Sequence, residues 1–200
     1  NMELGADYNF SPRFRISAGF FYRDQQDLID WANTLYSDMP RKSNLVPTGS
    51  YALAKNVEFV RTSGWELDMI YNEKTGPNGQ LLVMAGLTWL RSKNDDPVPS
   101  LYISSHARFL FNYSVAWTVK RFSLSVAGLY KERAEQSGSP INAKLSPSYF
   151  LMNTKAGWQL IPIKAKLFMQ ADNLFNISYS DLLGAQMPGR WLSGGIEIAL

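Results

Sequence analysis

The strongest constraint on the fold is an alternation of apolar and polar residues with a period of two. Between residues 107 and 119 every odd position is apolar, and Phe109, Phe111, Tyr113 and Trp117 all occupy this phase, whereas most even positions are polar. An α-helix turns once in about 3.6 residues and would scatter these apolar side chains around its whole surface. The pattern therefore predicts a β-strand with two chemically different faces.

The same alternation recurs along the whole chain and predicts about nine strands. Several of these segments reach about 11 to 18 residues, whereas strands of globular sheets most often have about 5–6. About 9–11 residues of a tilted strand cross the hydrocarbon core of a bilayer. The predicted strands cover residues 2–8, 13–23, 57–71, 81–89, 106–119, 122–130, 150–158, 163–171 and 192–200.

The connections between these strands alternate between short and long. Ser11-Pro12 and the link near Lys120 are tight turns, whereas the polar stretch from Gln25 to Ser50 is long. Later connections repeat the pattern: short at 75–79 and near Pro162, long at 95–99, 136–147 and 180–189. Tight turns at one end and long loops at the other are typical of outer-membrane barrels.

Hydropathy is consistent with spanning strands and excludes an ordinary spanning helix. The chain has no run of about 18 apolar residues, which a transmembrane helix needs. Aromatic residues make up 14% of the sequence, and Trp65, Tyr71, Trp89, Trp117 and Trp158 fall on the apolar phase. Several lie near predicted strand ends, where the aromatic girdles of membrane barrels lie. The predicted fold is an all-β, antiparallel transmembrane β-barrel with its apolar phase toward lipid.

Composition excludes several classes of function. The chain has no cysteine, one histidine and a net charge of +3 without a basic cluster. His106 has no recognisable nucleophile partner or metal-ligand spacing, so we expect no catalytic residue, metal or cofactor, and the protein is not expected to be an enzyme. Nucleic-acid binding has no support either. Glu58, Glu66 and Asp68 share one strand face, and we expect them to pair with basic residues of neighbouring strands.

Short motifs add a family resemblance. The segment from Phe168 contains Asn173-Leu174-Phe175, a short loop, Pro188-Gly189-Arg190 and a final strand, and it resembles the C-terminal end of TonB-dependent receptors. Upstream, the strand from Asn56 to Met69, with Gly64 and Glu66 in register, is similar to another motif of that family. The resemblance spans nearly the whole chain, although each motif is short.

The resemblance implies an architecture and a set of partners. Residues 1–200 would be the C-terminal part of a larger, roughly 22-stranded barrel, with the N-terminal plug domain absent from this chain. Expected partners are the lipid bilayer, the remaining barrel strands, the plug domain, TonB through that plug, and the outer-membrane assembly machinery. The assembly signal would comprise Ser193, Gly195, Ile198 and Leu200, where Leu200 departs from the more usual aromatic residue. The expected location is the bacterial outer membrane.

The function implied by the resemblance is active import of a scarce, bulky nutrient, either cobalamin or an iron-siderophore. The run from Asp181 to Gly184 resembles the cobalamin-receptor branch. Because function concentrates in loops, the candidate ligand-binding residues are Trp31, Tyr36, Arg41 and Tyr102. Two alternatives remain open: a passive porin or structural outer-membrane barrel that is complete as it stands, and a soluble lipocalin-like barrel with the apolar phase inside.

Overall fold

A computed structural model describes residues 1–46, 48–94, 106–134, 137–138, 143–161, 164–182 and 184–198. Its main element is one nine-stranded sheet, in the order β1-β2-β3-β4-β5-β6-β9-β10-β13. These strands are Met2–Ser11 (β1), Phe14–Leu35 (β2), Ser50–Lys74 (β3), Gly79–Asn94 (β4), Ala107–Val119 (β5), Phe122–Arg133 (β6), Ser148–Ile161 (β9), Ala165–Asp172 (β10) and Trp191–Ile198 (β13). The predicted number of long strands is confirmed.

Two small hairpins and one helical turn complete the described elements. Ser137–Gly138 (β7) pairs with Ala143–Lys144 (β8), and Ser180–Leu182 (β11) pairs with Ala185–Gln186 (β12). The short 3-10 helix Tyr36–Asp38 (η1) follows β2. No helix among the described residues is long and apolar enough to cross a membrane.

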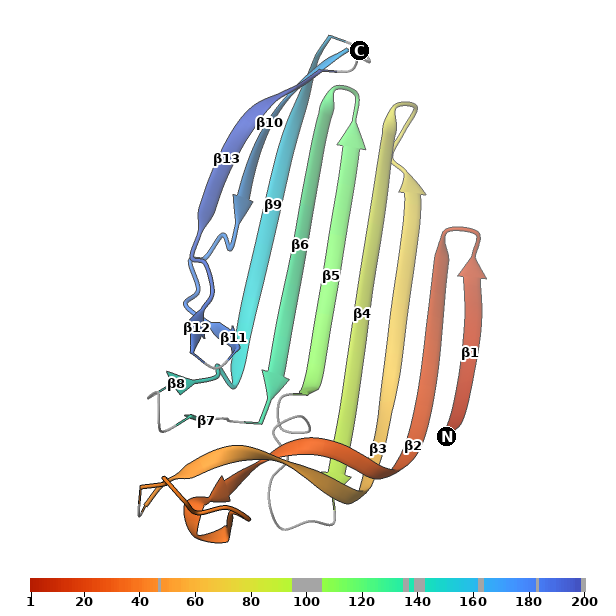
Figure 1. Cartoon of the computed structure of the whole chain (residues 1–200). Helices are drawn as coiled ribbons and strands as arrows, with labels where there is room; N and C mark the ends of the chain where they lie inside the picture. Colours follow the sequence, from red (N-terminus) through yellow and green to blue (C-terminus); the bar gives the residue numbers. More distant parts are fainter. Residues whose placement is uncertain are drawn as a thin grey trace.

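Every neighbouring pair in the main sheet is antiparallel, and the sheet is open (Figure 1). Its order follows the chain without a crossover between long strands. Tight turns lie at one end, as at Ser11–Phe14 and Val119–Phe122, whereas the long connections lie at the other end with the small hairpins (Figure 1). The predicted alternation of short and long connections is therefore confirmed.

The segment predicted as a long loop from Gln25 to Ser50 is nearly half strand. β2 continues to Leu35 and β3 begins at Ser50, so only residues 36–49 connect them. The extended hairpin bends across the loop end of the sheet instead of continuing straight (Figure 1). The alternation is weak here because both faces carry polar residues, yet the cross-strand backbone hydrogen bonds persist. The predicted boundary was wrong for this reason.

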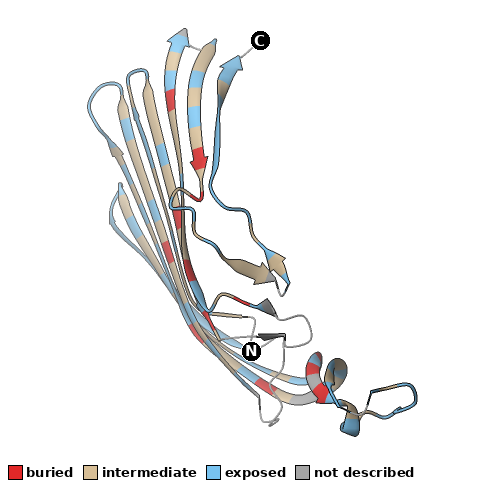
Figure 2. Ribbon diagram, turned by 90° about the vertical axis from the view of Figure 1, so that its left-hand side faces the viewer, coloured by how far each residue is buried: buried red, intermediate tan, exposed pale blue. Residues whose placement is uncertain are grey.

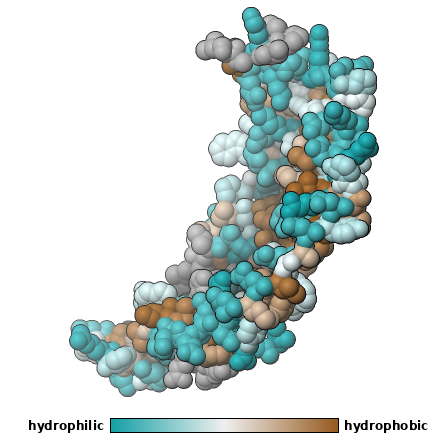
Figure 3. Space-filling model, turned by 90° about the vertical axis from the view of Figure 1, so that its right-hand side faces the viewer, coloured by the Kyte–Doolittle hydropathy of each residue, from teal (hydrophilic) through white to brown (hydrophobic). Residues whose placement is uncertain are grey.

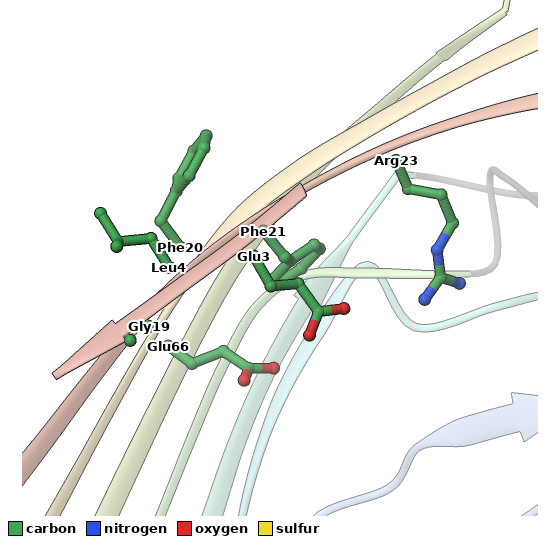
Figure 4. A pocket seen from close by; sticks show the side chains of 8 residues that line it. Glu3, Leu4, Gly19, Phe20, Phe21, Arg23 and Glu66 are labelled. Carbon is green, nitrogen blue, oxygen red and sulfur yellow. The ribbon is translucent and has the colours of Figure 1, made fainter. Parts of the chain in front are cut away.

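Strand register brings the apolar phase of all nine strands onto one face of the sheet. Phe20 lies opposite Trp65, which lies opposite Trp89, and the same row continues to Phe109. The next row contains Leu67, Leu87, Phe111, Tyr130 and Phe150. Since side chains alternate across a strand, the remaining phase forms a second continuous face. Figure 4 shows the division: Leu4 and Phe20 point to one side, and Glu3, Phe21 and Glu66 to the other.

The polar face is the concave one. Lys131 belongs to the same row as Glu66, and its ammonium contacts Asp181 of β11. The β11–β12 hairpin lies inside the curve of the sheet (Figure 2). The apolar phase therefore covers the convex side, where Leu4, Trp65 and Met169 remain 73%, 56% and 72% exposed.

The sheet has almost no dry core of its own. Among the described residues, the buried apolar side chains are Ala32, Val60, Leu145, Tyr149 and Ala171. Seen from the β1 edge, hydrophobic side chains gather in the middle of the molecule and again on its lower limb, among hydrophilic ones (Figure 3). An exposed apolar surface of this extent is unfavourable in water. The convex face therefore needs an apolar environment.

Candidate functional site

The concave wall carries charged groups, some of which are paired across strands. Arg15 contacts Asp7 at 2.9 Å, and the Lys155 ammonium lies 2.7 Å from a Glu197 carboxylate oxygen. Glu66 and Asp68 form no ion pair with another described residue, so the expected pairing of these two carboxylates is not observed. The side chain of Glu58 lies outside what the structure describes.

A shallow hollow on this wall lies near the β1 edge (Figure 4). Glu3 and Glu66 border it, with Phe21 beside them, and Gly5 and Gly19 form part of its floor. A Cβ added at Gly19 would meet only the Cβ of Glu66, at 4.0 Å. The hollow therefore presents two carboxylates above a floor that lacks side chains.

Trp31 lies on the hairpin formed by the outer parts of β2 and β3. Its side chain is 56% exposed, and Ile29 and Leu35 on the same phase of β2 are 76% and 58% exposed. The intervening side chains Asp30 and Ala32 are buried, which shows that the opposite face of β2 is covered. The hairpin thus presents an exposed apolar stripe, which we define as Ile29, Trp31 and Leu35.

The other predicted ligand-binding residues have different surroundings. Tyr36 is half-buried, and its ring packs against Gly49, where an added Cβ would lie 2.7 Å from ring carbon Cε2. Gly49 has a φ of +143°, which side-chain-bearing residues rarely adopt. Tyr36 therefore helps to fix the turn. Arg41 is exposed in that turn, and Tyr102 lies outside the described residues.

A partly buried network that sequence reasoning missed joins β6, the start of β9 and β11. One carboxylate oxygen of Asp181 accepts hydrogen bonds from Lys131 Nζ at 2.9 Å, Arg133 Nη1 at 2.9 Å and the Tyr149 hydroxyl at 3.0 Å. The Arg133 side chain is only 2% exposed. We call Lys131, Arg133 and Tyr149 the donor triad. The residues it joins lie up to 50 positions apart in sequence, so no local pattern indicates it.

Protonation of Asp181 is expected to release β11 in acid. Burial raises the pKa of this carboxyl, but hydrogen bonds from Lys131 and Tyr149 and the neighbouring positive charges outweigh it, and the net pKa is below the ordinary value. The contacts therefore stabilise the hairpin fully above about pH 4 and are lost as the pH falls through the lower folded pKa. Hydrogen exchange of residues 177–187, corrected for intrinsic rates, should accelerate only below about pH 4. Asp181→Asn should remove this pH dependence, and a transition near neutrality would contradict the assignment.

A second network explains the two short sequence motifs near the C-terminal end, Asn173-Leu174-Phe175 and Pro188-Gly189-Arg190. Asn173, which is 6% exposed, donates to the carbonyl oxygens of Ile177 at 2.8 Å and Pro188 at 3.2 Å, and accepts from the Ile177 amide at 2.9 Å. The Asn176 side chain accepts from the Arg190 amide at 2.8 Å. The asparagine run and the proline-glycine-arginine run thus meet, and together they close the base of the loop that carries β11 and β12.

Ser193, Gly195 and Ile198 of the predicted assembly signal lie on the exposed edge strand β13. Ser193 pairs with Gln170 and Gly195 with Phe168, while Ile198 pairs with Ala165. Ile198 is 69% exposed on the apolar phase. Leu200 lies outside the described residues. Their role in assembly stays a prediction.

The described residues contain no group of three or more histidine, cysteine or acidic side chains arranged to hold a metal ion. His106 lies just before β5, where burial lowers its pKa and the charge of Asp30 partly offsets that effect. This places His106 near the β2–β3 hairpin, where it interacts with its surroundings.

Fold and site together define a class of protein: a section of antiparallel barrel wall with an apolar exterior, a polar interior and elaborate loops at one end. Comparison with protein families identifies the family within this class. Residues 1–174 match the family described as TonB dependent receptor-like, beta-barrel, and the chain belongs to that family. No curated protein sequence matches the chain.

Solved structures of a receptor and of two transporters share this fold. The ferripyoverdine receptor of the outer membrane of Pseudomonas aeruginosa matches with a TM-score of 0.68 and 16% identity, covering 97% of this chain and 26% of that one. The FrpB iron transporter from Neisseria meningitidis gives 0.63 and 16%, covering 97% and 30%. The copper transporter OprC gives 0.65 and 17%, covering 98% and 30%. The chain thus spans about a quarter to three tenths of these structures.

Proposed function

We propose that residues 1–200 form the C-terminal part of the barrel domain of an active nutrient importer in the bacterial outer membrane. In this arrangement the convex face meets lipid, and the concave face lines the interior that the plug domain fills. The tight turns then lie on the periplasmic side and the β2–β3 hairpin outside the cell. The observation that carries the proposal is the continuous apolar convex face opposite a charged concave face.

Strand direction disfavours the alternative of a small barrel that is complete as it stands. Nine strands that are antiparallel in sequence leave β1 and β13 running in the same direction. Direct closure of the sheet would therefore require one parallel pair. A barrel closed entirely by antiparallel pairs needs an odd number of additional strands, as in a barrel of about 22 strands. The lipocalin-like alternative requires the apolar phase on the concave side, opposite to the observed curvature.

Of the two nutrient classes, an iron-siderophore has the better support. The similar structures include a receptor bound to ferripyoverdine and an iron transporter, although identities of 16% indicate a shared fold alone. A copper transporter of the same fold has similar scores. The similar structures named above are described as iron, ferripyoverdine and copper proteins, and the resemblance of residues 181–184 to the cobalamin-receptor branch stays a prediction. We propose a ferric chelate as the nutrient.

The exposed apolar stripe is the proposed first contact for this chelate. Large amphipathic aromatic residues are frequent anchors of binding sites, and Trp31 lies at the centre of the stripe. In the full receptor, Trp31→Ala is expected to weaken binding of the ferric chelate about tenfold. Calorimetric titration with a panel of ferric siderophores and cobalamin would measure affinity, and growth on each nutrient would measure import.

Tyr51→Ala is the matched control. Tyr51 is 66% exposed on the same hairpin, but it lies opposite Thr34 and therefore on the other face of the hairpin from Trp31. This variant should keep the affinity of the unmodified receptor. Equal losses in both variants would indicate general damage to the hairpin. Import of cobalamin and of no ferric chelate would overturn the choice of nutrient, and passive permeation without an energy source would overturn the importer itself.

A further inference from the structure

Arg133 of the donor triad is anchored mainly by the segment that leads into β9, and Ser146 of that segment also exchanges hydrogen bonds with Ser180 of the loop. Arg133 Nε donates to the carbonyl oxygen of Ser146 at 3.0 Å, and the Arg133 amide donates to that of Pro147 at 2.9 Å. The guanidinium also lies over the Tyr149 ring, 5.9 Å from its centroid. With Nε and the backbone engaged by the segment before β9, the two terminal nitrogens of Arg133 are directed toward β11.

The loop supplies one acceptor oxygen to each terminal nitrogen of Arg133. Arg133 Nη1 donates to Asp181 Oδ1 at 2.9 Å, while Nη2 donates to the Ser180 carbonyl oxygen at 2.7 Å. A carboxylate or phosphate presents two oxygens to a guanidinium in the same parallel fashion. Lys131 and Tyr149 add two further donors to the same oxygen of Asp181.

The charges in this cluster do not cancel. Lys131 and Arg133 are both cationic, and within the described network they face the single carboxylate of Asp181. The Asp181 side chain remains 36% exposed, so water reaches the loop side of the cluster. A free oxyanion could therefore approach from that side, compete for the donors and replace the loop in their hydrogen bonds.

We propose that Lys131, Arg133 and Tyr149 form an oxyanion-binding site at the loop end of the concave wall, occupied in this conformation by the chain's own Asp181. An external carboxylate or phosphate group that takes this site displaces β11 and frees the β11–β12 hairpin. The loop thus acts as a tethered competitor, and the position of this hairpin reports whether an oxyanion is bound. The site does not depend on which nutrient the receptor imports.

Inorganic phosphate is the probe for the test, applied at constant ionic strength to the full receptor purified in detergent. Phosphate should accelerate hydrogen exchange of residues 177–187 about tenfold. In Asp181→Asn the exchange should already be fast, and phosphate should bind about tenfold more tightly because the competing carboxylate is gone. In Lys131→Gln and Arg133→Gln phosphate binding should be lost.

Asp38→Asn is the matched control, since Asp38 is an exposed acid of η1 outside the network, and it should change neither measurement. If Asp181→Asn frees the hairpin but phosphate affinity does not rise, Asp181 is only a structural tie and the proposal fails. Phosphate that leaves exchange unchanged in the unmodified receptor also overturns it. If Asp181→Asn does not fold, phosphate binding by Lys131→Gln tests the proposal by itself. Phosphate binding that is unchanged in Lys131→Gln would exclude the site. Failure of the Trp31 experiment would leave these outcomes unaffected.

Discussion

Replacing Phe111 by arginine is expected to destabilise the receptor barrel by about 2–4 kcal/mol, the cost of a basic side chain near the bilayer midplane. Phe111 lies on the convex face in a row with Leu87 and Tyr130, and its ring is 5.9 Å from that of Tyr113. Arginine at this position would place a charge among side chains that otherwise meet hydrocarbon. Equilibrium unfolding by urea of the receptor refolded into lipid vesicles would measure the difference.

Asn112→Arg is the control, because Asn112 is the adjacent residue and its side chain points to the concave face. Its amide approaches the Gly86 position opposite, where an added Cβ would lie 3.0 Å from the Asn112 oxygen. A charge there remains on the polar side, so the loss should be well below that of Phe111→Arg. If both variants were equally stable in lipid, the convex face would not be the lipid face.

The strands and their two faces could be predicted because the signal is local. Alternation with a period of two is visible within each segment, and one segment such as 107–119 already shows which residues share a face. Register then follows from tight turns such as that at Lys120, which has a φ of +52°. Alternation alone does not show whether the apolar side chains lie on the convex or the concave face. Strand length and the alternation of short and long loops were needed to predict the convex face.

The loop end of the sheet could not be predicted in the same way. Where β2 and β3 continue past Arg23 and Arg61, polar residues occupy both faces, and the period that identifies a strand disappears. The donor triad depends on contacts between residues 32 to 50 positions apart, which no local pattern contains. Of the predicted binding residues, Trp31 lies on the exposed stripe, whereas Tyr36 is used to pack its own turn.

The motif near the C-terminal end, Asn173-Leu174-Phe175 with Pro188-Gly189-Arg190, has a local physical basis. Asn173 has a φ of +48°, a left-handed conformation that asparagine tolerates better than most residues. Its side chain reaches both the following turn and Pro188. The distance in sequence between the asparagine run and the proline-glycine-arginine run is therefore set by the loop whose two ends the Asn173 side-chain amide joins.

Asn173→Ala is consequently expected to destabilise the receptor barrel by about 2–4 kcal/mol, the sum of two effects. Alanine in the left-handed region costs about 1 kcal/mol or more. The loss of the buried side-chain hydrogen bonds removes the partner of the Ile177 amide, the Ile177 carbonyl and the Pro188 carbonyl, at about 1–3 kcal/mol. Hydrogen exchange over residues 174–190 and urea unfolding in lipid vesicles would locate and measure the loss.

Two variants separate these effects. Asn173→Gly removes the hydrogen bonds but accepts the positive φ, so it should recover roughly 1 kcal/mol relative to alanine. Asn44→Ala places alanine at another asparagine of positive φ, +68°, in an exposed turn, and should cost only the conformational part. Because the Asn173 amide holds the base of the loop that delivers Asp181 to the donor triad, its loss should also speed exchange at β11. Unchanged exchange at β11 in Asn173→Ala would show that the loop base and the donor triad are independent.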